Sequence, residues 1–358
     1  MLSMRAVGFC ALILAVVGFL GVALFGADDN KGVWTDPKDP SLPADFKFQG
    51  EYLSEDGKTG CQVISLGQKA FQAVVLRGGL PGAGWDGTNK ILIDGTLDDD
   101  KVTLKPAAGE RRYLDKKSDA FSASKKFPPV GQKDYSGTIS GETLSIKTDD
   151  DKTLTLKKTV RKSATLGAKP PEGAVVLFDG SNVDAFDDKA GLDPESKLLF
   201  PNGGDIRTKQ TFNNYTAHVE FMLQYMPDAR GQGRSNSGFY QVDRYEVQIL
   251  DSFGLDGIDD ECGGIYKKVT PKVNMCYPPL TWQTYDVEFT NAVLGEDGTK
   301  TKNTRISVKH NGVVIHDDAE VDGPTAGGSG KEGTPGPLQL QHHGNRVQFR
   351  NVWVVEKK

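Results

Sequence analysis

The sequence lacks a convincing amphipathic helix and lacks any concentration of positive charge. Acidic residues outnumber basic ones, 48 to 43, and the two signs are interspersed, which gives a net charge of −5. No basic face is therefore available to neutralise the phosphates of a nucleic acid, and we expect no nucleic-acid partner.

What the sequence has instead is a series of short strand-like runs. Glycine (42) and proline (18) are plentiful, and apolar and polar residues alternate between turns of Gly, Asp and Asn. This pattern predicts an all-β protein, with a small N-terminal β-meander or barrel-like domain followed by a jelly-roll β-sandwich.

The N-terminus has the features of an export signal. Arg5 precedes an uninterrupted apolar run over 6–25, and small residues follow it. We predict that 1–27 is a signal peptide, with an uncleaved membrane anchor through 6–25 as the alternative. In either case the protein is expected to be exported, as a periplasmic or envelope-associated protein.

Few cysteines are present, four in all. Cys10 lies in the apolar run, and Cys61 is expected to be a small apolar side chain in a strand. Cys262 and Cys276 are close enough in sequence to pair in an oxidising compartment, so we predict a disulfide between them, with two buried thiols as the alternative.

The chain divides at two proline-bearing segments. We expect a linker at 28–45, a small β domain at 46–160, a second linker at 161–173 and the sandwich domain at 174–358. The glycine-rich loop at 78–87 lacks the Lys and Ser/Thr of a phosphate-binding loop, so we do not interpret it as a nucleotide site.

Two local patterns predict hairpins. The segment DGTLDDDKVTLK at 94–105 resembles SGTISGETLSIK at 136–147, so one hairpin design occurs twice in the first domain. In the second domain, the Asn-Gly pair at 311–312 predicts a tight turn with positive φ at both residues.

Separated motifs occur in order through the second half of the chain, namely LFDGSNVDAF at 177–186, NSGFYQVDRYEVQILDSFG at 236–254, CGGIYKKVTPKVNMCYPPLTWQTYDVEF at 262–289, HNGVVIHD at 310–317 and GPLQLQHHGNRVQFRNVWV at 336–354. With these motifs, 174–358 resembles the 3-keto-disaccharide hydrolase domain family. Phe186 stands where that family usually has Trp, and NSGFY replaces the commoner NSGIFFR. The resemblance implies a concanavalin A-like lectin/glucanase jelly roll and an oxidised disaccharide or glycoside as substrate.

A ketone at C3 of a sugar acidifies the hydrogen at C2, so one base can remove that proton and expel the group at C1. His343 occupies the histidine position of the family's LQ-x-H-G motif, and we predict it to be the base or a metal ligand, with a surface histidine as the alternative. Gln341 shares a strand face with His343 by alternation. The sequence predicts no definite cofactor and leaves a divalent metal open.

A second polar cluster lies in RYEVQILD at 244–251. Glu246 and Gln248 are two residues apart and project to one face of a strand. Polar side chains there are costly to bury unless they meet a ligand or each other, so we predict a ligand groove, with a solvated outer face and a cross-strand ion pair as the alternative. We assign a catalytic role to His343 and Glu246. The predicted sugar-binding residues are Gln248, Arg244, Asp251, Gln341, Arg350 and Trp282.

The leading hypothesis is an exported enzyme that cleaves 3-keto glycosides or disaccharides by abstraction of the C2 proton, elimination and hydration. Its rival is a non-catalytic carbohydrate-binding module of the cell envelope, since the same jelly roll also serves in lectins. A structural or adhesion protein of the envelope is a third reading.

Overall fold

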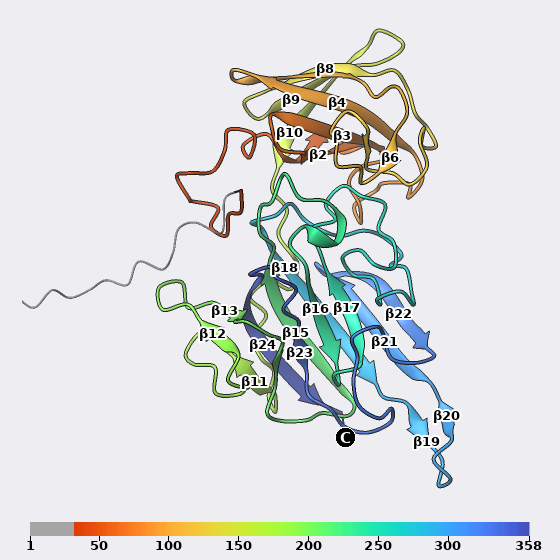
Figure 1. Ribbon diagram of the computed structural model, residues 1–358. Helices are drawn as coiled ribbons and strands as arrows, with labels where there is room; N and C mark the ends of the chain where they lie inside the picture. Colours follow the sequence, from red (N-terminus) through yellow and green to blue (C-terminus); the bar gives the residue numbers. More distant parts are fainter. Residues whose placement is uncertain (1–31, 358) are drawn as a thin grey trace, which may run out of the picture. The chain divides into compact units, whose positions relative to one another are not determined.

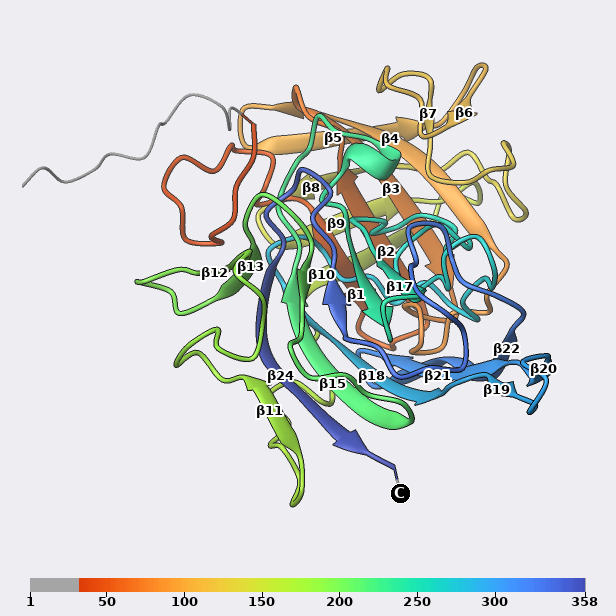
Figure 2. The ribbon, with the colours of Figure 1, turned by 60° about the horizontal axis from the view of Figure 1, so that its bottom comes forward.

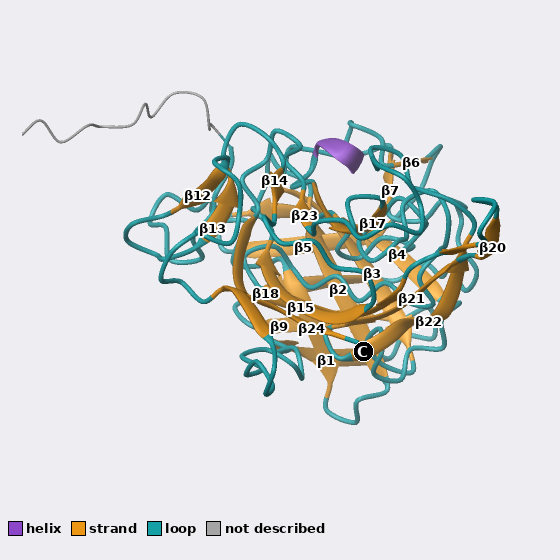
Figure 3. Cartoon of the chain, turned by 90° about the horizontal axis from the view of Figure 1, so that it is seen from below, coloured by secondary structure: helices purple, strands orange, loops and turns teal. Residues whose placement is uncertain are grey.

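A computed structural model describes residues 32–357, which belong to one compact unit that begins at Gly32. Within that range the chain consists of strands and loops, and one short 3-10 helix, η1 (Gly231–Gly233), is the exception (Figure 3). The predicted all-β fold class is confirmed. The predicted export segment and Cys10 lie outside the described residues, and within the described range no helix is long and apolar enough to cross a bilayer.

The first half of the chain forms a closed antiparallel barrel in the order β1-β10-β9-β8-β5-β4-β3-β2 (Figure 1). A two-residue parallel pair, β6 (Arg112–Tyr113) with β7 (Phe121–Ser122), lies in the long connection between β5 and β8. The barrel strands are β1 (Gly50–Ser54), β2 (Thr59–Ser65), β3 (Ala70–Arg77), β4 (Lys90–Asp98), β5 (Lys101–Pro106), β8 (Ser136–Ser140), β9 (Thr143–Lys147) and β10 (Thr153–Thr159).

Both predicted hairpin patterns lie in this barrel. The first corresponds to β4 and β5, paired from Asp98 opposite Lys101, and the second to β8 and β9, paired from Ser140 opposite Thr143. The repeated sequence therefore encodes a repeated local structure, as predicted.

Strands β2, β3 and β4 have apolar residues on both faces, because one face lies in the barrel core and the other packs against the sandwich. Val63 and Ala73 point into the barrel, whereas their neighbours Ile64 and Val74 belong to the apolar cluster that fills the second half of the protein. Alternation of side chains along a strand explains this division. One side of the barrel thus shares a core with the sandwich.

The second half is a two-sheet sandwich (Figure 2). The large sheet has the order β12-β13-β24-β15-β18-β21-β22, with β11 also paired to β24, and the small sheet has the order β14-β23-β16-β17. The large-sheet strands are β11 (Val175–Phe178), β12 (Ala190–Leu192), β13 (Leu199–Pro201), β15 (Tyr215–Met222), β18 (Trp282–Thr290), β21 (Thr304–His310), β22 (Val313–Val321) and β24 (Gln348–Glu356). The small-sheet strands are β14 (Ile206–Arg207), β16 (Ser237–Gln241), β17 (Tyr245–Ile249) and β23 (Gln339–Leu340), and a separate hairpin joins β19 (Val293–Leu294) to β20 (Lys300–Lys302).

The turn between β21 and β22 has the predicted geometry. Asn311 has φ 53° and Gly312 has φ 83°, the left-handed conformation that an Asn-Gly hairpin turn uses. The turn fixes the register of the two strands, with His310 opposite Val313.

The two predicted linkers are held by specific contacts in the described range. Trp34 forms a reciprocal backbone pair with Tyr225 of the sandwich, at 3.1 and 2.9 Å. In the second segment, Thr165 donates to Asp286 at 2.6 Å, and the Gly167 amide donates to Glu220 at 2.6 Å. The exposed part of that segment is 169–173.

Candidate functional site

A cavity of about 190 Å³ lies on the side of the small sheet that faces away from the core. Strand β17 places Tyr245, Val247 and Ile249 in the core cluster, so that the alternate residues Glu246 and Gln248 project to the opposite side. The cavity is lined by Gln232, Asn236, Tyr240, Glu246, Gln248, Tyr266, Ala326, Gly327, Gln341 and His343.

The strand register explains why these side chains meet. Tyr240 lies opposite Glu246, and Gly238 lies opposite Gln248, in the antiparallel pair β16–β17. Beside them, the Gln341 amide donates to the carbonyl of Gly238 at 2.9 Å. The structure thus brings together Glu246, Gln248, Gln341 and His343, the four residues for which alternation suggested a common face.

Glycine at position 238 provides the space for the Glu246 carboxyl group. A Cβ atom at Gly238 would lie 2.2 Å from Oε1 of Glu246 and 2.9 Å from its Cδ, which is far inside van der Waals contact. The glycine of the NSGFY motif is therefore a steric requirement of the site.

The hydroxyl of Tyr240 has three polar neighbours. Its Oη lies 2.9 Å from Oε2 of Glu246, 3.0 Å from the carbonyl oxygen of Ala326 and 3.2 Å from Nε2 of Gln341. A tyrosine hydroxyl has one proton to donate, and a carbonyl oxygen can only accept. If Tyr240 donates to Ala326 and accepts from Gln341, a protonated Glu246 that donates to Tyr240 satisfies every group.

The environment of Glu246 agrees with that protonated form. Burial raises the pKa of Glu246 to about 8, with the nearby charge of Asp205 acting in the same direction and the Tyr240 hydrogen bond opposing it. A carboxylic acid that keeps its proton at neutral pH can serve as a general acid.

One wall of the cavity is a network of side-chain amides. Nε2 of Gln248 donates to Oε1 of Gln232 at 3.1 Å, and Nε2 of Gln232 donates to the backbone carbonyl of Asp260 at 2.8 Å. Asn236 also donates to Gln232, at 3.0 Å. Uncharged amides of this kind suit the hydroxyl groups of a neutral sugar.

The two adjacent histidines have different positions. His343 is exposed and lines the cavity. His342 does not line it, and its backbone amide donates to Asp205 at 2.9 Å. Among the described residues there is no cluster of three or more His, Cys, Asp or Glu side chains suited to a metal.

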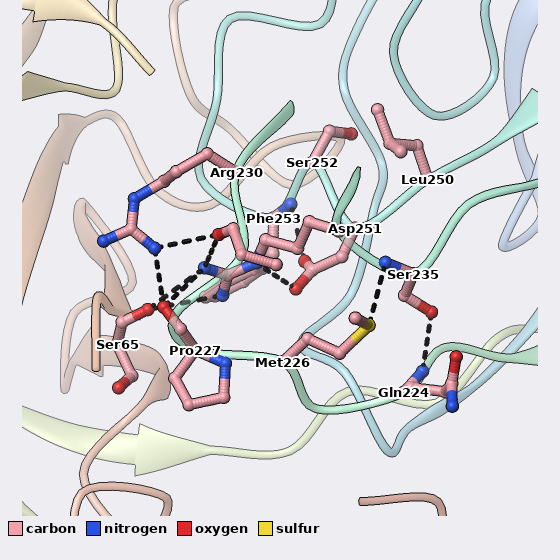
Figure 4. Close-up of polar contacts among 12 residues, drawn as sticks. Ser65, Gln224, Met226, Pro227, Arg230, Ser235, Leu250, Asp251, Ser252 and Phe253 are labelled. Atoms are coloured by element: carbon pink, nitrogen blue, oxygen red, sulfur yellow. Dashed lines mark hydrogen bonds and ion pairs between the residues drawn. The ribbon is translucent and has the colours of Figure 1, made fainter. Parts of the chain in front are cut away.

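Two of the predicted sugar-binding residues near β17 lie elsewhere. Arg244 is buried and donates to the carbonyl and hydroxyl oxygens of Thr334, at 2.8 and 2.7 Å, because the positive φ of Asp243 places it in a turn before the strand begins. Asp251 accepts from Nε of Arg234 at 2.6 Å. Figure 4 shows Asp251 within this buried polar network, near Ser65 and Pro227 and outside the cavity lining.

Arg350 and Trp282, also predicted to bind the sugar, do not line this cavity. Both lie on the large sheet, in β24 and β18, whereas the cavity lies on the small one. Nε of Arg350 donates to Glu220 at 2.6 Å, and its guanidinium lies 4.0 Å from the ring centroid of Trp282. These two side chains therefore stabilise one another.

The predicted Cys262–Cys276 disulfide is absent. Both cysteines are free and buried, and the thiol of Cys276 donates to the carbonyl oxygens of Leu250 and Tyr277, each at 3.5 Å. Cys262 also contacts the hydroxyl of Tyr285 at 3.2 Å. The structure therefore has two buried thiols, which was the alternative to the disulfide.

Sequence reasoning missed Gln232, Asn236 and the backbone wall at 326–327. Asn236 belongs to the NSGFY motif, which was a usable signal. Gln232 and the segment 326–327 lie in loops distant in sequence, for which strand alternation makes no prediction.

A larger cavity, of about 530 Å³, lies near Tyr277 and Pro278. Two of its lining residues, Glu51 and Arg161, are paired with each other at 2.6 Å, and its lining contains none of the residues predicted for the sugar site. We therefore place the candidate chemistry in the smaller cavity.

The second half of the chain is thus a two-sheet jelly roll whose small sheet carries a polar, amide-lined cavity. Residues 173–355, half of the chain, match the family described as the 3-keto-alpha-glucoside-1,2-lyase-like domain. The chain belongs to this family, and the resemblance predicted from its motifs is confirmed.

Similar solved structures come from Parabacteroides distasonis and are described as those of proposed glycosyl hydrolases. One is 32% identical over 52% of this chain and 85% of its own, with a TM-score of 0.48. Another is 19% identical over 52% and 95%, with a TM-score of 0.39. No curated protein matches.

Proposed function

We propose that this protein cleaves the glycosidic bond of a glycoside or disaccharide oxidised at C3, by elimination followed by hydration. His343 removes the proton from C2, and the electron pair of that C–H bond forms a double bond between C1 and C2. The bond from C1 to the glycosidic oxygen breaks, and Glu246 donates its proton to the departing oxygen.

Hydration completes the reaction. Water adds across the new double bond, with its oxygen on C1 and a proton on C2, so the net change is hydrolysis. His343 returns the proton that it removed, and Glu246 recovers its own from the water. Gln248 and Gln341 hold the sugar hydroxyls during both steps.

The observation that carries this proposal is the buried carboxyl group of Glu246, with its raised pKa, in the same cavity as His343. An elimination needs a base at C2 and an acid at the leaving oxygen, and the two groups must have different protonation states at one pH. Burial gives Glu246 the pKa of an acid of about 8, while His343 is exposed at the cavity.

The test compares turnover of a 3-keto disaccharide with turnover of the unoxidised sugar. We expect release of the second sugar only from the oxidised substrate, with a loss of about 100-fold or more in kcat for His343→Ala and retained binding. His342→Ala is the matched control and should keep its activity. Binding of both sugars without turnover of either would instead identify a carbohydrate-binding module.

We further propose that the protein is exported to the periplasm or envelope, on the basis of the apolar run at 6–25. Cell fractionation tests this, with mass analysis of the N-terminus to distinguish cleavage near Ala27 from a retained anchor. Recovery of the full-length protein in the cytoplasm would overturn the proposal.

A further inference from the structure

Two walls of the candidate site come from loops and not from the small sheet. One is the segment around η1, which provides Gln232, and the other is the loop 256–266, which provides Tyr266. The hydrogen bond from Gln232 to the Asp260 carbonyl, 2.8 Å long, joins them. Whatever holds these two segments determines the shape of the cavity.

The barrel holds the loop 256–266 through Asp256. Nζ of Lys90, in β4, lies 2.7 Å from Oδ1 of Asp256, and the amide of Lys125 donates to Oδ2 at 2.7 Å. The Lys90 side chain is only 7% exposed, so solvent screens this ion pair less than it would a surface pair.

The barrel holds the same loop a second time through Glu261. The hydroxyl of Tyr113, in β6, donates to Oε1 of Glu261. Oε2 of Glu261 accepts from the amides of Gly257 and Ile258, at 2.7 and 3.1 Å. The carboxyl group of Glu261 therefore bonds two amides of its own loop and also the hydroxyl of Tyr113, which lies in the connection between β5 and β8.

The segment around η1 is held by the adjoining barrel strand. Nη2 of Arg230 donates to the carbonyl of Leu66 at 2.7 Å, and Arg234 donates to the carbonyl of Ser65 at 3.3 Å. Figure 4 shows Arg230 and Ser65 among the polar contacts of this segment. Both walls of the cavity are thus fixed by barrel residues that do not line it.

We propose that the N-terminal barrel is a working part of the sugar site, and that Lys90 and Tyr113 are positioning residues for its loop wall. The inference rests on the proposed function for its catalytic readout. It assigns to the barrel the task of holding Tyr266, and the Asp260 carbonyl that fixes Gln232, in place beside the bound sugar, since binding groups that are held in place in advance raise affinity.

The test uses the full chain with Lys90→Met and Tyr113→Phe, singly and together. Each variant keeps its side-chain volume close to the original and removes one contact to the loop 256–266. We expect KM for the 3-keto disaccharide to rise about tenfold in the double variant, with kcat changed much less, because the loop wall binds the sugar and His343 and Glu246 stay in place.

Two controls separate positioning from general stability. Lys133→Met removes an exposed barrel ion pair, Lys133 with Asp149 at 2.6 Å, and should leave KM unchanged. Lys90→Arg retains the charge opposite Asp256 and should restore most of the lost affinity. A rise in KM for Lys133→Met equal to that for Lys90→Met would overturn the proposal.

Hydrogen exchange provides a readout that does not depend on activity. In the double variant, exchange should accelerate in 256–266 and in 230–236 while the barrel strands keep their protection. If the wild type shows no turnover but these segments loosen, the proposed function fails and the positioning role survives. If the wild type is active and neither KM nor exchange changes, the positioning role fails alone.

Discussion

At the scale of single residues, the protonation of Glu246 governs the chemistry. The proposed acid must hold a proton, and its pKa is about 8. We therefore expect kcat to fall as the pH rises through about 8. The measurement is a pH–rate profile of the wild type, and a profile flat to pH 10 would exclude Glu246 as the acid.

The same carboxyl group links stability to pH. Its pKa is about 8 in the folded protein, against an ordinary value of 4.5, so the folded state binds the proton more tightly. Its contribution to stability is therefore complete below about 4.5 and is lost as the pH rises through about 8. Glu246→Gln does not titrate and should be more stable than the wild type at pH 9, by on the order of 3 kcal/mol.

Urea unfolding at pH 5 and pH 9 checks this expectation. The variant and the wild type should be close at pH 5 and should separate at pH 9, while turnover of the variant is lost at both. An equal stability difference at the two pH values would show that Glu246 does not carry the shifted pKa.

The buried thiols make a separate residue-scale prediction. Cys262 and Cys276 are free and inaccessible, so both should resist an alkylating reagent in the native protein and react fully after unfolding without any reductant. Mass mapping of the digested protein measures this. Recovery of a linked peptide containing both cysteines would contradict the structure.

At the scale of elements, the pairing of β16 with β17 leaves room for the acid only if position 238 is glycine. Gly238→Ala would place a methyl group 2.2 Å from the Glu246 carboxyl oxygen, and we expect a loss of at least tenfold in kcat with a destabilisation of about 1–3 kcal/mol. The control is Gly323→Ala, where a Cβ atom meets nothing within 4 Å. Wild-type kcat for Gly238→Ala would show that the carboxyl position is not critical.

Local sequence patterns predicted strands and turns better than they predicted contacts between residues distant in sequence. Alternation in β17 placed Glu246 and Gln248 on one face, and the Asn-Gly pair predicted the turn after His310. The same rule failed for Arg244, because alternation ends at the positive-φ turn that contains Asp243. Alternation describes the residues within a strand, but it does not predict at which residue the strand begins or ends.

The position of Arg350 depends on which sheet its strand joins. Arg350 follows the small-sheet strand β23 closely in sequence, yet β24 belongs to the large sheet beside β15. Nothing in the local sequence distinguishes these outcomes. The partner of Arg350, Glu220, is 130 residues away.

At the scale of the whole molecule, the division of the chain remains a prediction, and 169–173 is the place to test it. This run is exposed, so we expect a glutamate-specific protease to cut after Glu172, and Glu172→Gln to prevent the cut. The two fragments should elute together, because the Lys90–Asp256 pair and the shared apolar cluster still join them. Cleavage confined to 180–350 would argue against this boundary.

The shared cluster has a consequence for the order in which the protein is made. The barrel emerges from the ribosome first, and its closed ring of strands offers no open edge to a neighbouring chain. Yet Ile64, Val74 and Leu92 on its outer side belong to an apolar cluster most of whose members are translated later. The nascent barrel therefore has no open strand edge at which another chain could pair. Its outer apolar surface nevertheless stays exposed until the sandwich is complete, and shielding that surface from association is the role of a chaperone.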